Sequence, residues 1–171
     1  PVLGASTVTV GVQGIHHIGV SVPDIEKARS FYIDVLGGVE EVPPLEWRDN
    51  AFIDSVVGLK DSAAKQFFCR LGNAHIEVFE YAQPRSAPQD PDRGVHNFGY
   101  THFAIQVDDV LATHARLAAA GIRVHAPPSM AGITMAEDGS KRGYAATYCR
   151  DWFGNVFEIM EIHDTDEVKR V

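Results

Sequence analysis

The pattern of hydrophobic and polar positions along this chain contains two similar short apolar stretches. Residues 15–22 and 99–107 are rich in β-branched and other apolar residues, which is typical of strands. Each stretch is followed by an aspartate that can cap a helix, Asp24 in the first case and Asp109 in the second. Apolar residues then recur with helical spacing. The pattern therefore predicts a strand followed by a helix, twice.

The remaining elements complete the same plan in each half of the chain. The helices are predicted at residues 24–36 and 109–120, and glycines follow both, as is common at helix ends. Residues 47–59 give no clear pattern, and residues 129–142 are loop-rich. The strands that follow the two helices are predicted at 39–42, 66–71, 74–81, 122–126, 144–150 and 155–162.

The two halves also share sequence. Cys69-Arg70 is echoed by Cys149-Arg150, and Ile76–Glu80 is echoed by Phe157–Glu161. A period of about 80 residues is longer than the 20–50 residues of a solenoid repeat, which favours a duplicated module. The sequence predicts an α+β fold of two tandem βαβββ modules. Its parts are an N-terminal arm at 1–14, a first module at 15–81, a linker at 82–97, a second module at 98–162 and a tail at 163–171.

A histidine and a glutamate occupy matching positions in both modules. His17 and His102 lie on the small or polar face of the first strand of their module, opposite the apolar face that can pack on the helix. Glu77 and Glu158 lie inside apolar strands, where a carboxylate is costly unless it is paired, hydrogen-bonded or bound to a metal. An exposed strand face would explain one such glutamate. Their recurrence favours a shared site for a divalent first-row metal.

Several of these segments together resemble the vicinal oxygen chelate superfamily. They are His17-Ile18-Gly19, Thr101–Ala104, the helix end Phe31–Gly37 and the hairpin Gly154–Glu158. This superfamily includes glyoxalase I, methylmalonyl-CoA epimerase, extradiol dioxygenases and fosfomycin or bleomycin resistance proteins. The resemblance covers about residues 15–162. It implies a partly open mixed β-barrel around a metal whose ligands are His17, Glu77, His102 and Glu158.

The resemblance also implies a reaction. A glyoxalase I-like lyase or an epimerase moves a proton next to a carbonyl that is chelated together with a neighbouring oxygen, so the substrate is a small molecule with vicinal oxygens. The cofactor would be a divalent ion of Zn, Ni, Co, Mn or Fe. Glu158 and Glu77 are candidates for the base. His75 lies two residues before Glu77 on the same strand face, as a second base, a substrate contact or a rim residue.

Two other functions stay open. An extradiol-type ring-cleaving dioxygenase needs two histidines, one carboxylate and open positions on Fe(II). A metal-free drug-binding resistance protein of bleomycin type uses the cleft without a metal, which leaves four ligand residues without a purpose. The chain departs from the family pattern at Trp152, which replaces a proline, and at 57–65, which contains no glutamate where the epimerase-like proteins carry an extra acidic base.

Composition limits the partners. The formal net charge of −8 argues against nucleic acid, and no apolar run approaches the ~20 residues of a membrane span. Residues 1–14 carry no basic region typical of a signal peptide, and two cysteines 80 positions apart favour reduced thiols in a cytoplasmic protein. We expect a homodimer, in which the modules pair within one chain or exchange between two chains.

Other polar residues receive structural interpretations. His16 is predicted to face the helix and to pack in the core, and Cys149 is predicted to be a core thiol. Tyr148 and Arg150 alternate on the last hairpin, where one of them is a candidate substrate contact, with packing favoured for Tyr148.

Overall fold

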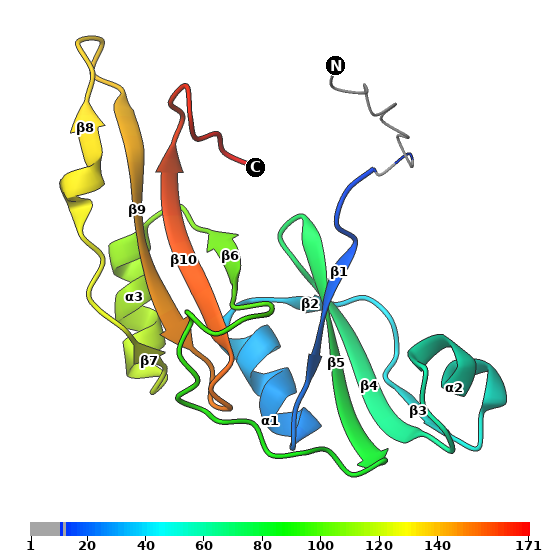
Figure 1. The fold of residues 1–171 in the computed structure, drawn as a ribbon. Coiled ribbons are helices and arrows are strands. Elements are labelled where there is room, and N and C mark those ends of the chain that lie inside the picture. The colour runs from blue at the N-terminus through cyan, green and yellow to red at the C-terminus, as the bar shows by residue number, and fades with distance from the viewer. Residues whose placement is uncertain (1–10, 12) are drawn as a thin grey trace, which may run out of the picture.

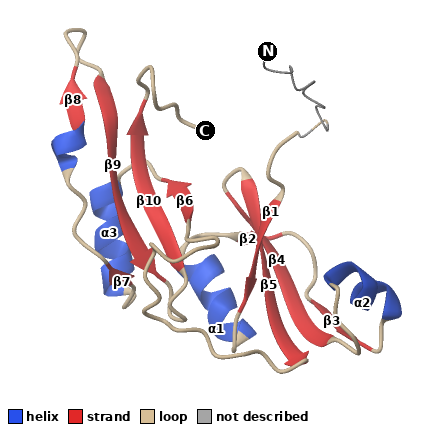
Figure 2. Cartoon of the chain, in the orientation of Figure 1, coloured by secondary structure: helices blue, strands red, loops and turns tan. Residues whose placement is uncertain are grey.

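The computed structural model describes residue 11 and residues 13–171, so most of the predicted N-terminal arm at 1–14 lies outside the described residues. The described part folds into two five-stranded sheets, one from each half of the chain (Figure 1). Figure 2 shows that strands separate the helices along the described part of the chain. The predicted α+β class with a duplicated plan is therefore confirmed.

The first module is a mixed sheet with a helix that follows its first strand. The sheet order is β1-β5-β4-β2, in which β1 runs parallel to β5, and β3 pairs with β4. The helix α1 continues directly into a π-helical segment, η1. The elements are β1 (His17–Ser21), α1 (Ile25–Arg29), η1 (Ser30–Val35), β2 (Val39–Glu40), β3 (Leu45–Arg48), α2 (Ala51–Val57), β4 (Ala63–Leu71) and β5 (Ala74–Gln83).

The second module repeats this arrangement. Its order is β6-β10-β9-β7, with β6 parallel to β10, and β8 pairs with β9 as β3 does with β4. Its elements are β6 (Phe103–Gln106), α3 (Val110–Ala119), β7 (Arg123–Val124), η2 (Met130–Gly132), β8 (Ile133–Met135), β9 (Lys141–Arg150) and β10 (Val156–His163).

The structure corrects the predicted elements mainly at the sheet edges. The strand predicted at 99–107 begins only at Phe103, and that at 39–42 ends at Glu40. The unclear segment 47–59 forms the end of β3 and α2, and the loop-rich segment 129–142 contains β8. Short edge strands such as β3 and β8 exist because they pair with a long neighbour, and a pattern of single residues does not reveal that pairing.

Two carboxylates cap the N-terminus of each main helix. One comes from the residue before the helix and the other from the last strand of the same module: Asp24 and Glu80 for α1, and Asp109 and Glu161 for α3. Glu80 Oε2 accepts the N–H of the first helical residue at 2.8 Å, and Glu161 Oε2 does so at 3.1 Å. This ties each helix to one face of its sheet. None of the described helices is long and apolar enough to cross a membrane.

One hydrophobic core joins the two modules. Phe31 of η1 is fully buried, and its ring lies 5.5 Å from that of Phe157 on β10 and 5.7 Å from that of Trp152. Figure 1 shows α1 between the two sheets. Because side chains alternate along a strand, a helix that packs on Phe157 leaves Glu158 on the opposite face of β10. The helix layer therefore lies inside, and the faces that carry the candidate ligands lie outside.

Candidate functional site

The first His–Glu pair (His17 and Glu77) lies on the outer face of the first sheet. In the parallel register of β1 and β5, Glu77 is opposite Gly19, two residues after His17, so both side chains share a face. His17 Nε2 lies 3.2 Å from Glu77 Oε2. The side-chain amide of Gln66 on β4 donates a hydrogen bond to Oε1 of the same carboxylate. The carboxylate is thus held from two sides.

The second His–Glu pair (His102 and Glu158) repeats this geometry in the second sheet. Glu158 on β10 is opposite Ala104, two residues after His102, and His102 itself lies just before β6. His102 Nε2 lies 3.3 Å from Glu158 Oε2. The Nδ1 atom of His102 is 2.9 Å from the hydroxyl of Thr101, and its ring centroid is 4.4 Å from that of Tyr148.

Both pairs have the spacing and chemistry of two neighbouring metal ligands. Metal–ligand bonds of about 2.1 Å place two donor atoms about 3.0 Å apart at a right angle and about 3.4 Å apart at a tetrahedral angle. The nitrogen-to-oxygen distances of 3.2 and 3.3 Å fall between these values. One imidazole nitrogen and one carboxylate oxygen from each module suit a divalent first-row ion. The residues present therefore fit such a group.

The structure forms the two pairs but does not bring them together within one chain. Over residues 11 and 13–171, no three histidine, cysteine, aspartate or glutamate side chains gather closely enough to hold a metal ion. The cause is the shared core, because α1 and η1 pack between the sheets and the two pairs lie on opposite outer faces. Each module supplies half of the predicted four-ligand set, and the complete set stays a prediction.

His75 belongs to a cluster of rings at the edge of the first pair. Its Nε2 atom lies 3.2 Å from Glu41 Oε2, and its ring stacks on that of His16 at 5.1 Å. Arg70 Nε donates to the other oxygen of Glu41 at 2.6 Å. The hydrogen bonds from Arg70 and His75 hold the pKa of Glu41 below its ordinary value. His75 thus lies two residues from Glu77 with its ring fixed by a carboxylate.

The prediction that His16 packs in the core is wrong. His16 is exposed, and its Nδ1 atom lies 2.9 Å from Nδ1 of His17. The residue precedes β1, so strict alternation does not apply to it, and its ring turns toward His17, Phe68 and His75 instead. His16 therefore contacts the first pair directly.

Sequence analysis missed one neighbour of the pairs, Gln66, which donates to Glu77. For Tyr148 it favoured packing over a substrate contact, and the ring of Tyr148 does pack against that of His102. Both lie on the strand hydrogen-bonded to the glutamate strand, with Tyr148 directly opposite Glu158. The signal available was the strand alternation, which puts them on the glutamate face once the register is known.

Arg150 was a candidate substrate contact from the sequence, but its contacts give it a structural role. It is 6% exposed, and its guanidinium donates to the carbonyl oxygens of Gly154 and Arg93 at 2.9 Å and to that of Pro91 at 3.2 Å. Its Nε atom donates to His125 at 3.1 Å. Arg150 thus fastens the segment between the modules onto the second sheet.

The two cysteines are core thiols, as predicted. Cys69 and Cys149 are fully buried and not disulfide-bonded. Burial raises the pKa of each thiol to about 11, so neither is an activated nucleophile.

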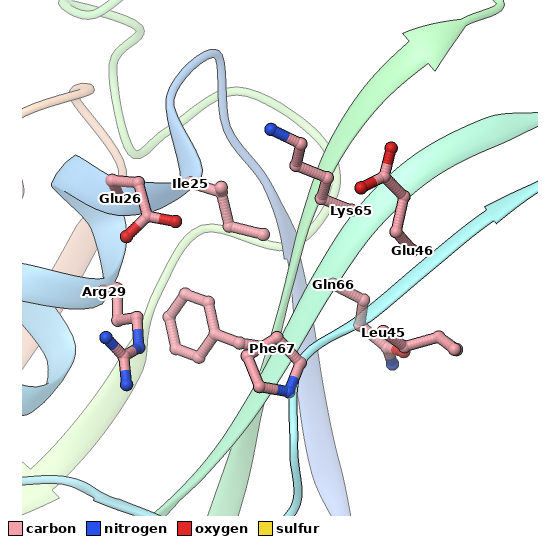
Figure 3. A pocket seen from close by; sticks show the side chains of 9 residues that line it. Ile25, Glu26, Arg29, Leu45, Glu46, Lys65, Gln66 and Phe67 are labelled. Atoms are coloured by element: carbon pink, nitrogen blue, oxygen red, sulfur yellow. The ribbon is translucent and has the colours of Figure 1, made fainter.

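A pocket of about 280 Å³ lies away from both pairs, between α1 and the strands β3 and β4 (Figure 3). Its lining includes Phe67, which belongs to the core on the helix side of the first sheet. Arg29 also lines it and is engaged by Glu40 at 2.7 Å. Gln66 takes part in the lining, but its amide donates to Glu77. None of the four candidate metal ligands lines this pocket, which is therefore separate from the candidate metal site.

Comparison with known sequences identifies a family. The sequence profile described as the Glyoxalase/Bleomycin resistance protein/Dioxygenase superfamily matches residues 14–159. The chain is 32% identical over 124 residues to a 2-epi-5-epi-valiolone epimerase of an Actinomyces species, covering 69% of this chain and 65% of that protein. It is 31% identical over 105 residues to the mitochondrial methylmalonyl-CoA epimerase of Mus musculus, covering 57% and 48%. The chain thus spans about half to two thirds of these relatives.

Solved structures share the fold. A glyoxalase family protein from Bacillus cereus superimposes with a TM-score of 0.73 at 17% identity, covering 91% of this chain and 98% of that one. The fosfomycin resistance protein FosX from Listeria monocytogenes, solved with Mn(II) and sulfate, gives a TM-score of 0.55 at 18% identity over 91% and 96%. At these identities the likeness concerns the fold alone.

Proposed function

Because the chain belongs to the Glyoxalase/Bleomycin resistance protein/Dioxygenase superfamily, we propose that it is a metal-dependent epimerase, or a related lyase, acting on a small molecule with vicinal oxygens. The observation that carries the proposal is the recurrence of one His–Glu pair, at 3.2 and 3.3 Å, in both modules. The curated relatives named above are epimerases, which favours epimerisation over the related glyoxalase reaction and over ring cleavage by a dioxygenase.

The four paired residues would hold the cation. His17, Glu77, His102 and Glu158 offer two imidazoles and two carboxylates, a donor set that suits Zn, Ni, Co, Mn or Fe. When bound, a divalent ion stabilises the negative charge that develops on oxygen as the α-proton leaves, which is worth several kcal/mol. The two carboxylates also balance the double charge of the cation, which lowers the cost of placing it on a partly buried face.

Epimerisation needs one group that removes a proton and one that returns it to the opposite face of the same carbon. The chain offers Glu77 and Glu158, each from a different module, and His75 beside the first pair. We assign proton removal and return to the two glutamates. The Gln66 amide would steady Glu77, and the hydrogen bond that His75 donates to Glu41 would fix the His75 ring at the edge of the site.

The separation of the pairs extends the proposal to a homodimer with shared sites. Since the shared core leaves the first and second pair on opposite outer faces, the first pair of one chain would meet the second pair of its partner. Large apolar side chains are exposed in both modules: Phe52 and Val56 on α2 are 75% and 68% exposed, and Phe98 and Tyr100, shortly before His102, are fully exposed. Such residues are expected at an interface between copies.

A D₂O exchange screen tests the proposed reaction. Protein loaded with Mn²⁺, Ni²⁺ or Zn²⁺ is incubated with 2-methyl acyl-CoAs and glutathione thiohemiacetals, and exchange of the α-proton is followed by NMR. Catechols are tested in parallel for oxygen uptake. We expect metal-dependent exchange with an acyl-CoA or another 2-substituted carbonyl compound, lost on chelation and restored by the ion. Oxygen uptake with catechols would show a dioxygenase instead, and the absence of both metal binding and turnover would overturn the proposal.

A further inference from the structure

Three aromatic side chains form a second feature on the outer face of the first sheet, which we call the aromatic cluster (Trp47, Phe79 and Tyr81). Phe79 and Tyr81 follow Glu77 on β5 by two and four residues, so they share its face. Their rings stack at 5.7 Å, and the ring of Trp47 from β3 stands edge-on to both at 6.0 Å. The cluster thus continues the face that carries the first His–Glu pair.

The cluster is not part of the hydrophobic core. None of its three residues belongs to the buried cluster that joins the two modules, which lies on the other side of the sheet. Trp47 is 7% exposed, whereas Phe79 and Tyr81 are half-buried. Burial, followed by the negative charge of Glu77, raises the pKa of Tyr81, which agrees with a ring close to the carboxylate. Apolar rings thus stand partly open beside a candidate metal ligand.

Small residues on the neighbouring strand keep these rings uncovered. Gly19 and Ser21 of β1 are exposed and share the face of His17. In the register of β1 and β5, they are opposite Glu77 and Phe79. A Cβ atom at Gly19 would meet a single described atom within 4 Å, Cε2 of Phe79 at 3.9 Å. The space beside Gly19 is therefore open, and the ring of Phe79 borders it.

Hydrogen bonds hold the cluster in place from behind. The indole N–H of Trp47 donates to the hydroxyl of Ser62 at 3.0 Å, and Ser62 is fully buried. The backbone N–H of Ser62 donates to Asp54 of α2 at 2.9 Å, and its hydroxyl donates to the same carboxylate oxygen. This chain fixes the Trp47 ring without using its faces, so the rings it supports form a rigid surface.

The second module offers no matching surface. Met160 and Ile162 follow Glu158 by two and four residues and replace Phe79 and Tyr81. The nearest aromatic ring to the second pair is instead Tyr148, which packs on His102 itself. Aromatic rings thus continue the sheet face beside only one of the two otherwise matching pairs. A site shared by both pairs would therefore have a polar side and a flat apolar side.

From these observations we infer that the aromatic cluster is a substrate subsite. It takes a flat apolar group, an aromatic ring or an unsaturated carbon ring, that is attached next to the two vicinal oxygens. This inference rests on the proposed function for the position of those oxygens beside His17 and Glu77. Stacking of a ligand ring on Phe79 contributes beyond its buried area, whereas a methyl group gains little from the same surface.

A matched pair of 2-oxo acids tests the subsite. Phenylglyoxylate and pyruvate present the same two oxygens and differ in a phenyl or a methyl group. Their dissociation constants for the Mn²⁺-loaded chain are measured by calorimetry. Quenching of Trp47 fluorescence in a Trp152→Phe background gives a second reading, because the chain has two tryptophans. We expect phenylglyoxylate to bind at least about tenfold more tightly, with quenching of Trp47.

Variants locate the preference. Phe79→Ala removes the ring, and Gly19→Val fills the space that the ring borders from an exposed position, so each is expected to bring the ratio of the two constants to within about threefold. Met160→Ala, the matching change in the second module, is expected to leave the ratio unchanged. Equal binding of both acids to the unmodified chain, or a ratio that survives both Phe79→Ala and Gly19→Val, overturns the subsite.

Calorimetry with Mn²⁺ alone separates this inference from the proposed function. If the ion binds and both acids bind equally, the subsite is wrong and the metal site stands. If the ion does not bind but the phenyl preference depends on Phe79, the subsite stands and the metal-dependent function is wrong.

Discussion

The two His–Glu pairs have the same geometry in different surroundings. The nitrogen-to-oxygen distance is 3.2 Å in the first pair and 3.3 Å in the second. In the first, the side chain of His17 is 41% exposed, its neighbours include His16, and an amide holds Glu77. In the second, the side chain of His102 is 25% exposed and is covered by Tyr148.

This comparison distinguishes the residues that the two modules share from those that differ between them. Within one duplicated chain, the imidazole and the carboxylate recur at the same register, whereas the residues around them do not. A pair kept only for sheet stability would not require an imidazole beside a half-buried carboxylate in both copies. We therefore propose the pair as the working unit, with the differing neighbours on the two sides of the proposed shared site.

The largest expected effect comes from removing one carboxylate from either pair. Glu77→Gln and Glu158→Gln should each weaken Mn²⁺ binding by at least about 100-fold, since the loss of an inner ligand exceeds the 10–100-fold cost of losing an outer one. Calorimetry measures the effect, and Glu137→Gln, in an exposed loop, is the control. If only one of the two variants lost the ion, the pairs would not act in one site.

A smaller effect is expected from the neighbour that only the first pair possesses. Gln66→Leu removes the hydrogen bond to Glu77 and should weaken Mn²⁺ binding by about tenfold, at the low end for a residue that supports a ligand. Gln83→Leu, at the exposed end of β5, is the matched control. Unchanged affinity in Gln66→Leu would show that this amide does not support the ligand.

The two helix caps give a third comparison, in stability. Burial acts to raise the pKa of Glu161, but hydrogen bonds from His163 and from the Val110 N–H, with the charge of Lys141, outweigh it, so the pKa lies below its ordinary value. Glu80 makes the matching cap without these partners among its described contacts. At pH 7, Glu161→Gln should lower the free energy of unfolding by about 2 kcal/mol and Glu80→Gln by about 1 kcal/mol.

The sign of the pH dependence follows from that lowered pKa. The stabilisation by Glu161 is fully present above the titration range of an unfolded glutamate, about pH 4.3, and is lost as the pH falls through the lower folded-state value. Urea unfolding from pH 7 to pH 3 should therefore show the wild type and Glu161→Gln converging in acid. A constant difference over that range would contradict the assignment.

The sequence predicted what depends on local patterns and on the repeat. Asp24 and Asp109 indicate where their helices begin, and the repeat aligned His17 with His102 and Glu77 with Glu158. It could not place His16, because a residue just outside a strand is free to turn either way. Nor could it show that Phe31 packs on Phe157, a contact 126 positions apart along the chain that sets both pairs on outer faces.

Co-expression of Glu77→Gln and Glu158→Gln chains tests most directly whether the two pairs combine across chains. If they do, each mixed dimer contains one site with both pairs intact and one with neither. Random pairing of equal amounts should then restore about a quarter of the wild-type Mn²⁺ capacity and turnover. If mixed dimers form and neither is restored, the pairs do not combine between partner chains, and the shared site is contradicted.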